Sequence, residues 1–170
     1  LDNHLLPNLV PRGVPHATLG LTSPFEFNSI ESLKKTLNKH PQEFAAVVLE
    51  PFRDNGPKAN YLDEVRALCD EHNILLIFDE VTSGFRETLG GMYVRETVKP
   101  DLVTFGKAMS NGVPMAALVG RETVMQSFTT TFVSSTYWGD LTGPTAALAA
   151  IKFMEENDTG REIRNIREKL

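Results

Sequence analysis

Two residues that could do chemistry together, Asp79 and Lys107, follow strand-like stretches of the sequence. Asp79 closes the apolar run ILLIF at 74–78, where a desolvated carboxylate is costly unless it has a partner. If the strand continues, Val81 lies on the same face as Asp79. The carboxylate could then bond the edge of a flat heterocycle while Val81 packs on its ring. The alternative is an aspartate that bonds backbone amides, and the tripeptide by itself favours that alternative.

Lys107 follows a second strand-like run, DLVTFG at 101–106. A lone lysine at a strand end is usually a solvated surface group, and Gly106 can simply make a turn. Here, however, the lysine is expected at the same end of the sheet as Asp79. An amine held in a partly desolvated pocket loses its proton more easily and can form a Schiff base.

Two further polar residues lie at strand ends: Glu50 closes the apolar run at 44–50, and Ser83 lies in the loop TSGFR that follows Asp79. In open α/β sheets, ligands gather at the carboxyl ends of strands, so both residues belong to the candidate site. Ser83 could bond near a ligand or stabilise a turn, and the turn is the favoured interpretation. No histidine stands at metal-ligand spacing from a second ligand, so no metal site is predicted.

The elements that must position these groups alternate between strands and helices. Apolar runs predict buried strands at 44–50, 73–81, 101–107 and 115–120, and a short strand at 16–21. Helical spacing predicts helices at 29–39 (with Asn28 as the N-cap and Glu31 completing a capping box), from about Leu62 to His72, at 121–128 and at 142–157. This alternation predicts an α/β fold with a mostly parallel sheet covered by helices.

Composition and charge exclude several classes of partner. The chain has 170 residues and a net charge of −5, without a clustered Lys/Arg stripe, so neither nucleic acid nor an anionic membrane is an expected partner. No apolar run approaches the length of a membrane span. The lone cysteine, Cys69, is expected to pack as a small apolar residue in a reducing cytoplasm.

Three stretches of the sequence resemble successive signature blocks of the class III aminotransferases. They are FDEVTSGFR at 78–86, PDLVTFGKAMSNGVPMAALVG at 100–120 and SSTYWGDLTGPTAALAAIKFME at 134–155. They are most similar to the branch that includes the glutamate-1-semialdehyde aminomutases. The resemblance implies a pyridoxal-phosphate (PLP) dependent transferase of fold type I, with residues 1–170 forming part of its large, cofactor-binding domain.

The resemblance also implies a role for each candidate residue. Lys107 would hold PLP as a Schiff base and later shuttle the proton, while Asp79 would bond the pyridine nitrogen and Val81 would pack on the ring. Thr136 would reach the cofactor phosphate of a neighbouring subunit, which implies a homodimer. Glu50 matches a Glu-Pro motif near the site, and it could equally be a loop carboxylate that bonds nearby amides.

The same resemblance implies that the phosphate loop lies upstream of this chain and the small domain downstream. We therefore expect the isolated chain to bind PLP weakly and to be inactive. For the parent protein, the resemblance implies PLP-dependent amino-group transfer from a small-molecule amino donor to a carbonyl acceptor, or an intramolecular aminomutase reaction. The alternatives are a PLP decarboxylase or racemase, and a catalytically silent paralogue that acts in dimerisation or regulation.

Overall fold

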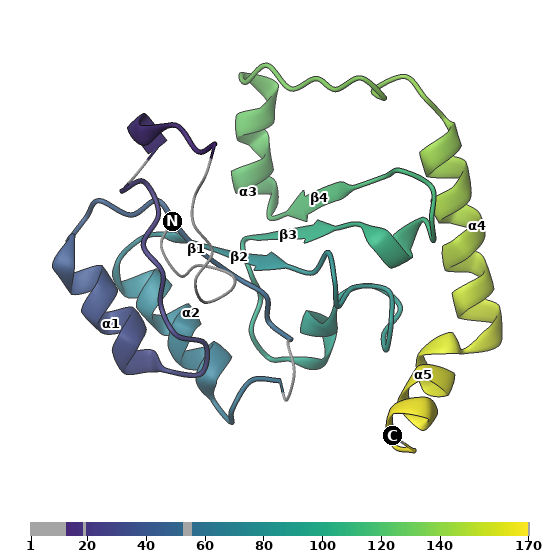
Figure 1. Cartoon of the computed structure of the whole chain (residues 1–170), viewed down its shortest axis with the longest axis horizontal. Helices are drawn as coiled ribbons and strands as arrows, with labels where there is room; N and C mark the ends of the chain where they lie inside the picture. The colour runs from purple at the N-terminus through teal and green to yellow at the C-terminus, as the bar shows by residue number, and fades with distance from the viewer. Residues whose placement is uncertain (1–12, 19, 53–55, 170) are drawn as a thin grey trace. The chain divides into compact units, whose positions relative to one another are not determined.

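A computed structural model of the chain describes residues 13–18, 20–52 and 56–169. The chain divides into two compact units, residues 1–44 and residues 45–170 (Figure 1). All the candidate residues belong to the second unit.

The first unit contains helix α1 (Ile30–Lys39), whose Leu33 and Leu37 are buried at helical spacing. The predicted N-cap at Asn28 is wrong, because Ser29 has the extended backbone that a cap requires and its hydroxyl accepts a hydrogen bond from Ser32 N–H at 3.3 Å. Asn28 instead adopts a left-handed conformation, with φ of 63°.

The predicted strand at 16–21 is also wrong. His16–Thr18 forms a 3-10 helix, closed by a hydrogen bond of 3.0 Å from Thr18 N–H to the carbonyl of Pro15. The prolines and glycines around this stretch favour turns over a strand. Residue 19 of the predicted strand lies outside the described residues.

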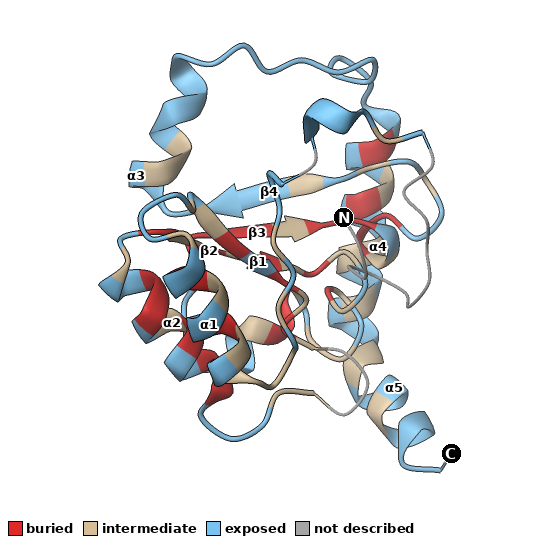
Figure 2. Cartoon of the chain, turned by 60° about the vertical axis from the view of Figure 1, so that its left-hand side comes forward, coloured by how far each residue is buried: buried red, intermediate tan, exposed pale blue. Residues whose placement is uncertain are grey.

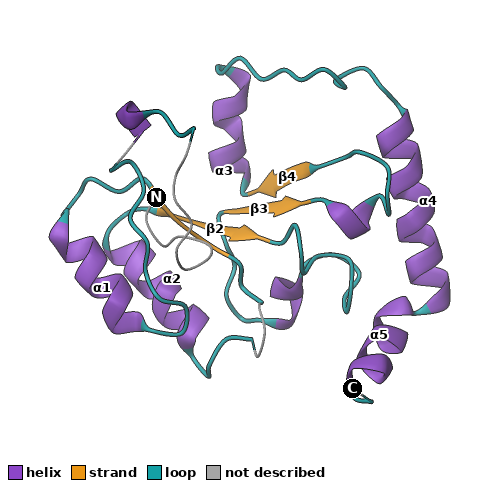
Figure 3. Ribbon diagram, viewed as in Figure 1, coloured by secondary structure: helices purple, strands orange, loops and turns teal. Residues whose placement is uncertain are grey.

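The second unit is built on a four-stranded sheet in the order β1-β2-β3-β4 (Figure 3). Its strands are β1 (Ala46–Leu49), β2 (Leu75–Asp79), β3 (Leu102–Phe105) and β4 (Ala117–Gly120). The first three are parallel, and β4 pairs antiparallel with β3. The prediction of a mostly parallel α/β sheet is confirmed. The parallel strands bring the carboxyl ends of β2 and β3 to one edge, where Asp79 pairs with Thr104.

The core of this unit lies between β2, β3 and helix α2 (Tyr61–Glu71) (Figure 2). Val65 and Cys69 on the helix and Leu76 and Phe78 on β2 are all fully buried. Burial of one such apolar side chain contributes about 1.5–3 kcal/mol, so this layer holds the sheet in place. Cys69 packs in it as predicted.

Short helical turns and two longer helices complete the second unit. They are η2 (Met92–Arg95), η3 (Lys107–Met109), α3 (Glu122–Met125), η4 (Gln126–Thr129), α4 (Thr142–Asn157) and α5 (Thr159–Arg167). The predicted helix at 142–157 is confirmed, with Pro144 in its first turn, where its missing N–H has no helical partner to lose. Among the described residues, no helix has the length and apolarity to cross a membrane.

Candidate functional site

Asp79 is the last residue of β2 and is half-buried. Its Oδ1 atom accepts a hydrogen bond from Val81 N–H at 3.0 Å and another from the Thr104 hydroxyl at 3.3 Å. These two bonds fix the plane of the carboxylate. Within the described part of the chain, nothing donates to the other oxygen, Oδ2. The backbone-bonding alternative therefore describes one oxygen of Asp79 and leaves the second available to a ligand.

Val81 does not share a strand face with Asp79, because β2 ends at Asp79 and the carboxylate captures the Val81 amide. The predicted continuation of the strand to residue 81 is wrong for that reason. Val81 nevertheless lies beside the peptide that precedes Lys107: a Cβ atom built on Gly106 would be 3.5 Å from Val81 Cγ1. The turn after β2 thus places the Val81 side chain beside the end of β3.

Lys107 begins the 3-10 helix η3, immediately beyond the end of β3 at Phe105. Its backbone is left-handed, with φ of 45°. This conformation costs a residue other than glycine about 1–2 kcal/mol, and such strain is concentrated at functional sites. The side chain is exposed, and its Nζ donates to the Thr82 hydroxyl at 2.8 Å. The predicted strand to residue 107 is therefore too long by two residues.

Thr82 was not among the residues predicted from the sequence. Its position in the loop after β2, one residue beyond Val81, was the available signal, because this loop leaves the same sheet edge as Lys107. Sequence reasoning could not tell which way its hydroxyl points.

Ser83 acts on the loop itself. Its hydroxyl donates to Glu80 Oε2 at 2.6 Å, so the turn-stabilising interpretation describes the contact that it makes. Glu80, also missed by the sequence analysis, is fully buried. Its two carboxylate oxygens further accept the amides of Met92 at 2.9 Å and Tyr93 at 3.0 Å. Glu80 thereby ties the loop after β2 to the helix η2.

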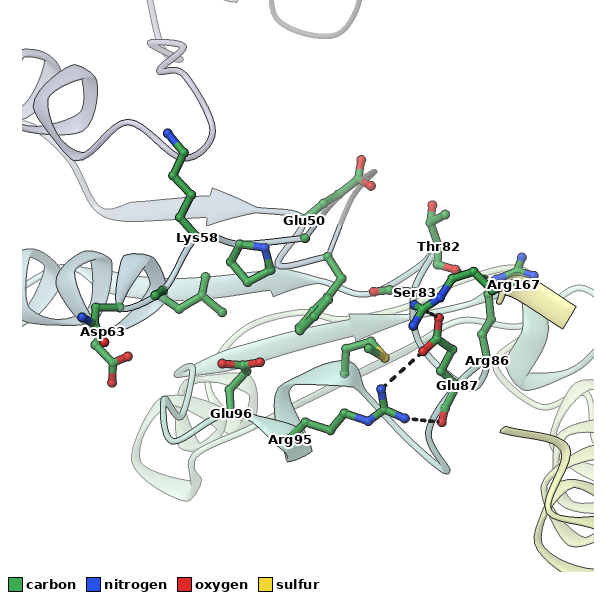
Figure 4. Close-up of a pocket in the computed structure, with 17 residues that line it drawn as sticks. Glu50, Lys58, Asp63, Thr82, Ser83, Arg86, Glu87, Arg95, Glu96 and Arg167 are labelled. Atoms are coloured by element: carbon green, nitrogen blue, oxygen red, sulfur yellow. Dashed lines mark hydrogen bonds and ion pairs between the residues drawn. The ribbon is translucent and has the colours of Figure 1, made fainter. Parts of the chain in front are cut away.

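Glu50 follows β1 and lines a cleft of about 1120 Å³ together with Thr82 and Ser83 (Figure 4). The cleft carries charges of both signs: the remaining charged residues of its wall are Lys58, Asp63, Arg86, Glu87, Arg95, Glu96 and Arg167. Asp79 and Lys107 do not line this cleft. Thr82 is therefore the residue that belongs both to the cleft wall and to the Lys107 contact.

The cleft wall is fastened by contacts around Glu87. Its carboxylate pairs with Arg95 at 3.3 Å and also with Arg167 of α5, while its carbonyl accepts from Arg164 at 2.6 Å. Arg86 turns to its own loop, donating from Nε to the carbonyl of Thr82 at 2.6 Å. These contacts attach α5 to the loop that follows β2.

Thr136 lies apart from the other candidate residues in the bonding pattern. It is exposed on the stretch between η4 and α4. Within the described residues, no hydrogen bond or ion pair joins Thr136 to Asp79, Lys107 or Glu50. The neighbouring Tyr137 and Trp138 are 64% and 71% exposed, so this stretch presents large aromatic surfaces to solvent.

A second buried carboxylate, Asp101, lies at the opposite end of β3 from Lys107. It accepts the Leu76 amide at 2.7 Å and pairs with Arg66 at 2.7 Å and Arg121 at 3.1 Å. Burial by itself would raise the pKa of Asp101, but the Leu76 amide and the two arginines outweigh it and hold the pKa below the usual 3.8. Asp101 is a structural carboxylate.

Known proteins similar to this chain are amino-transferring enzymes. Residues 7–170 match the family model described as Aminotransferase class-III. The chain is 38% identical to the glutamate-1-semialdehyde 2,1-aminomutase of Archaeoglobus fulgidus, over 98% of the chain and 41% of that protein. It is 40% identical to the 3-aminobutyryl-CoA aminotransferase of Cloacimonas acidaminovorans, over 87% of the chain and 37% of that protein. The chain thus spans about two fifths of the length of these relatives.

Solved structures agree in fold. An omega-transaminase from Sphaerobacter thermophilus matches with a TM-score of 0.78 and 28% identity, over 89% of this chain and 36% of that one. A taurine:2-oxoglutarate aminotransferase from Bifidobacterium kashiwanohense, solved with PLP and glutamate, matches with a TM-score of 0.72 and 30% identity, over 82% of this chain and 34% of that one. These likenesses confirm the predicted PLP-dependent transferase fold.

Proposed function

The chain belongs to the class-III aminotransferase family, and from this premise we propose that the protein carrying it transfers an amino group with pyridoxal phosphate. When bound, pyridoxal phosphate supplies an electron sink for the charge that develops on the amino-bearing carbon of the substrate. One observation carries the proposal: the carboxylate of Asp79 ends β2 and the amine of Lys107 follows β3, so both lie at the same edge of two adjacent parallel strands.

The residues around this edge fit the cofactor. Asp79 has one oxygen fixed by Val81 N–H and Thr104, and its Oδ2 is the atom that would bond a protonated pyridine nitrogen. The carboxylate would keep that nitrogen charged. Val81, beside Gly106, offers an apolar surface for the ring. The donor set thus has an anionic anchor, an apolar wall and a primary amine, as a cationic aromatic aldehyde requires.

Lys107 is assigned two tasks. Its Nζ is the primary amine that would hold the cofactor covalently in the site. When it is not engaged with the cofactor, the same Nζ would accept and return a proton at the amino-bearing carbon of the substrate. When Nζ is not bonded to the cofactor, it donates a hydrogen bond to the Thr82 hydroxyl at 2.8 Å.

The other candidate residues have supporting roles in this proposal. Ser83 contributes through Glu80 and the shape of the turn. Glu50 faces the cleft that Thr82 also lines, so it is assigned to the surroundings of the substrate. Thr136 is assigned to the cofactor phosphate of a second subunit, because it stands on an exposed stretch with the exposed aromatic residues Tyr137 and Trp138. This assignment implies a homodimer. We also propose that the protein acts in the cytoplasm, where a lone buried cysteine such as Cys69 stays reduced.

We further propose that residues 1–170 form part of a larger cofactor-binding domain and do not turn over by themselves. The support is the coverage: the chain accounts for 41% of the Archaeoglobus fulgidus aminomutase and 36% of the Sphaerobacter thermophilus transaminase. The remaining parts of the phosphate and substrate sites are assigned to the rest of the protein. Turnover by the purified 170-residue chain would contradict this proposal.

The relatives support two reactions that share Asp79 and Lys107, a transaminase that needs a carbonyl acceptor and an aminomutase that moves the group within one molecule. Incubating the complete protein with an amino donor, with and without a keto acceptor, separates them. Lys107→Ala must abolish product in either case, while Lys152→Ala on the exposed face of α4 should retain it. Absence of product under both conditions would favour a silent paralogue.

A further inference from the structure

We propose that Glu80 is a positioning residue: its buried carboxylate fixes the turn that carries Thr82, and through Thr82 it directs the Lys107 amine. This inference rests on the proposed function for its meaning, since it concerns the lysine assigned to the cofactor. The geometry that supports it is independent of any cofactor.

The carboxylate of Glu80 is held by three donors and is 0% exposed. Oε2 accepts the Ser83 hydroxyl at 2.6 Å and the Met92 amide at 2.9 Å, and Oε1 accepts the Tyr93 amide at 3.0 Å. In the described part of the chain, no arginine, lysine or histidine pairs with it. A buried charge persists only when hydrogen bonds replace its water, so these donors must stay in place.

The backbone of the same residue closes the turn. Gly84 N–H donates to the Glu80 carbonyl at 2.8 Å, so residues 80–84 form a compact loop bonded at both its side chain and its main chain. A Cβ on Gly84 would lie 2.6 Å from Phe105 Cδ1, which shows how closely the loop packs on the end of β3. A Cβ on Gly91 would lie 2.7 Å from Glu80 Oε1. Gly91 thus packs closely against the carboxylate, while Gly84 packs against Phe105 and the carbonyl of Glu80.

Thr82 stands in the middle of this loop, and its hydroxyl is the partner of Lys107 Nζ at 2.8 Å. The lysine side chain is exposed, and a lysine stem is flexible, so its direction depends on what its amine contacts. Glu80 fixes the loop on one side of Thr82, and Gly84 fixes it on the other. A loosened Glu80 therefore moves the Thr82 hydroxyl that holds the amine.

Glutamine cannot replace Glu80 at this position. All three partners of the carboxylate are donors, so an amide group would turn its NH₂ toward at least one donor, leaving a buried amide of Met92 or Tyr93 unpaired. Asp101 provides the matched control, since Asp101→Asn removes another buried carboxylate of the same domain, at the opposite end of β3.

The test measures the Lys107 amine directly. In the complete, cofactor-free protein, the rate of acetylation of Lys107 by limiting acetic anhydride is compared with that of Lys152 on α4, by mass spectrometry of peptides. We expect Glu80→Gln to raise the Lys107 rate about threefold to tenfold, the effect of releasing one hydrogen bond. Thr82→Val, which removes the partner itself, should give the same rise, and Asp101→Asn should leave the rate unchanged.

Several outcomes overturn the proposal. A Lys107 rate in Glu80→Gln equal to that of the unaltered protein does so, and so does an equal rise in Asp101→Asn, which would make the effect one of general stability. If Glu80→Gln does not fold, Ser83→Ala removes one donor and must still raise the rate. If borohydride traps pyridoxal phosphate on Lys107 but Glu80→Gln leaves the acetylation rate unchanged, the positioning role of Glu80 is wrong and the proposed function stands. If the acetylation rates change as predicted but no cofactor is trapped on Lys107, the positioning role stands and the proposed function is wrong.

Discussion

Lys107 Nζ donates to Thr82 Oγ1 at 2.8 Å, and the two residues come from loops that follow adjacent parallel strands. The contact joins the strained Lys107, beyond the end of β3, to the turn that follows Asp79 at the end of β2 and that also contains Val81. The site thus depends on two short loops meeting at one sheet edge, and substitutions in either loop should be felt in both.

The left-handed backbone of Lys107 predicts an order of stability among its variants. Lys107→Gly should be about 0.5–1 kcal/mol more stable than Lys107→Ala, because glycine adopts this conformation without strain and that gain exceeds its greater loss of chain entropy. Urea unfolding of the two variants measures the difference. A more stable alanine variant would show that the backbone at this position is not left-handed.

Asp79→Asn separates the charge of Asp79 from its hydrogen bonds. The amide oxygen can still accept from Val81 N–H and Thr104, so the stability should change little. The neutral side chain cannot keep a pyridine nitrogen protonated, so amino transfer should fall roughly 10²-fold, as for the loss of one preorganised electrostatic contact. Thermal unfolding checks the expected stability of the variant, and a turnover assay checks the expected loss of amino transfer. Turnover near that of the unaltered protein would remove Asp79 from the site.

Asp101 predicts how stability responds to acid. Because the pKa of Asp101 in the folded chain lies below its usual 3.8, its stabilising contribution is fully present above that value and is lost as the pH falls through the folded pKa. The free energy of unfolding should therefore decline below about pH 4.

Asp101→Asn should flatten that decline and cost about 1.5–3 kcal/mol near neutral pH, because it removes the buried partner of Arg66 and leaves that side chain only the exposed Asp70, at 2.7 Å. Denaturant unfolding across the acid range measures both effects. An equally steep acid decline in the variant would mean that other carboxylates dominate it.

Cys69 should be inert in the folded protein. Burial raises the pKa of its thiol to about 11, and the side chain has no exposed surface. Thiolate is the reactive form, so an alkylating reagent should modify Cys69 only after unfolding. Intact-mass measurement with and without denaturant tests this, and rapid modification of the native protein would contradict the packing of α2 against the sheet.

Much of the positioning could be predicted from the sequence. Asp79 and Lys107 follow apolar runs whose β-branched and aromatic residues specify buried strands, so their common sheet edge was predictable from the order of the elements. The helix at 142–157 was predictable to its bounds, because alanine-rich periodicity and Pro144 define its start. The family resemblance then supplied the chemistry.

The remaining details depend on contacts distant in sequence. Glu80 continues the alternation that buries Leu76 and Phe78, but the amides that satisfy its carboxylate come from Met92 and Tyr93, twelve and thirteen residues later. Val81 left the strand because its amide bonded the Asp79 carboxylate, a local competition that periodicity does not register. For the same reason, the direction of Thr82 was not predictable.

The assignment of Lys107 to the cofactor is tested most directly by locating the bound cofactor. The complete protein is mixed with pyridoxal phosphate, reduced with borohydride, digested and mapped by mass spectrometry, beside its Lys107→Ala variant. We predict a single pyridoxyl adduct on Lys107 that is absent from the variant. Adducts scattered over surface lysines, or none at all, would contradict the assignment of Lys107 as the cofactor-bearing residue.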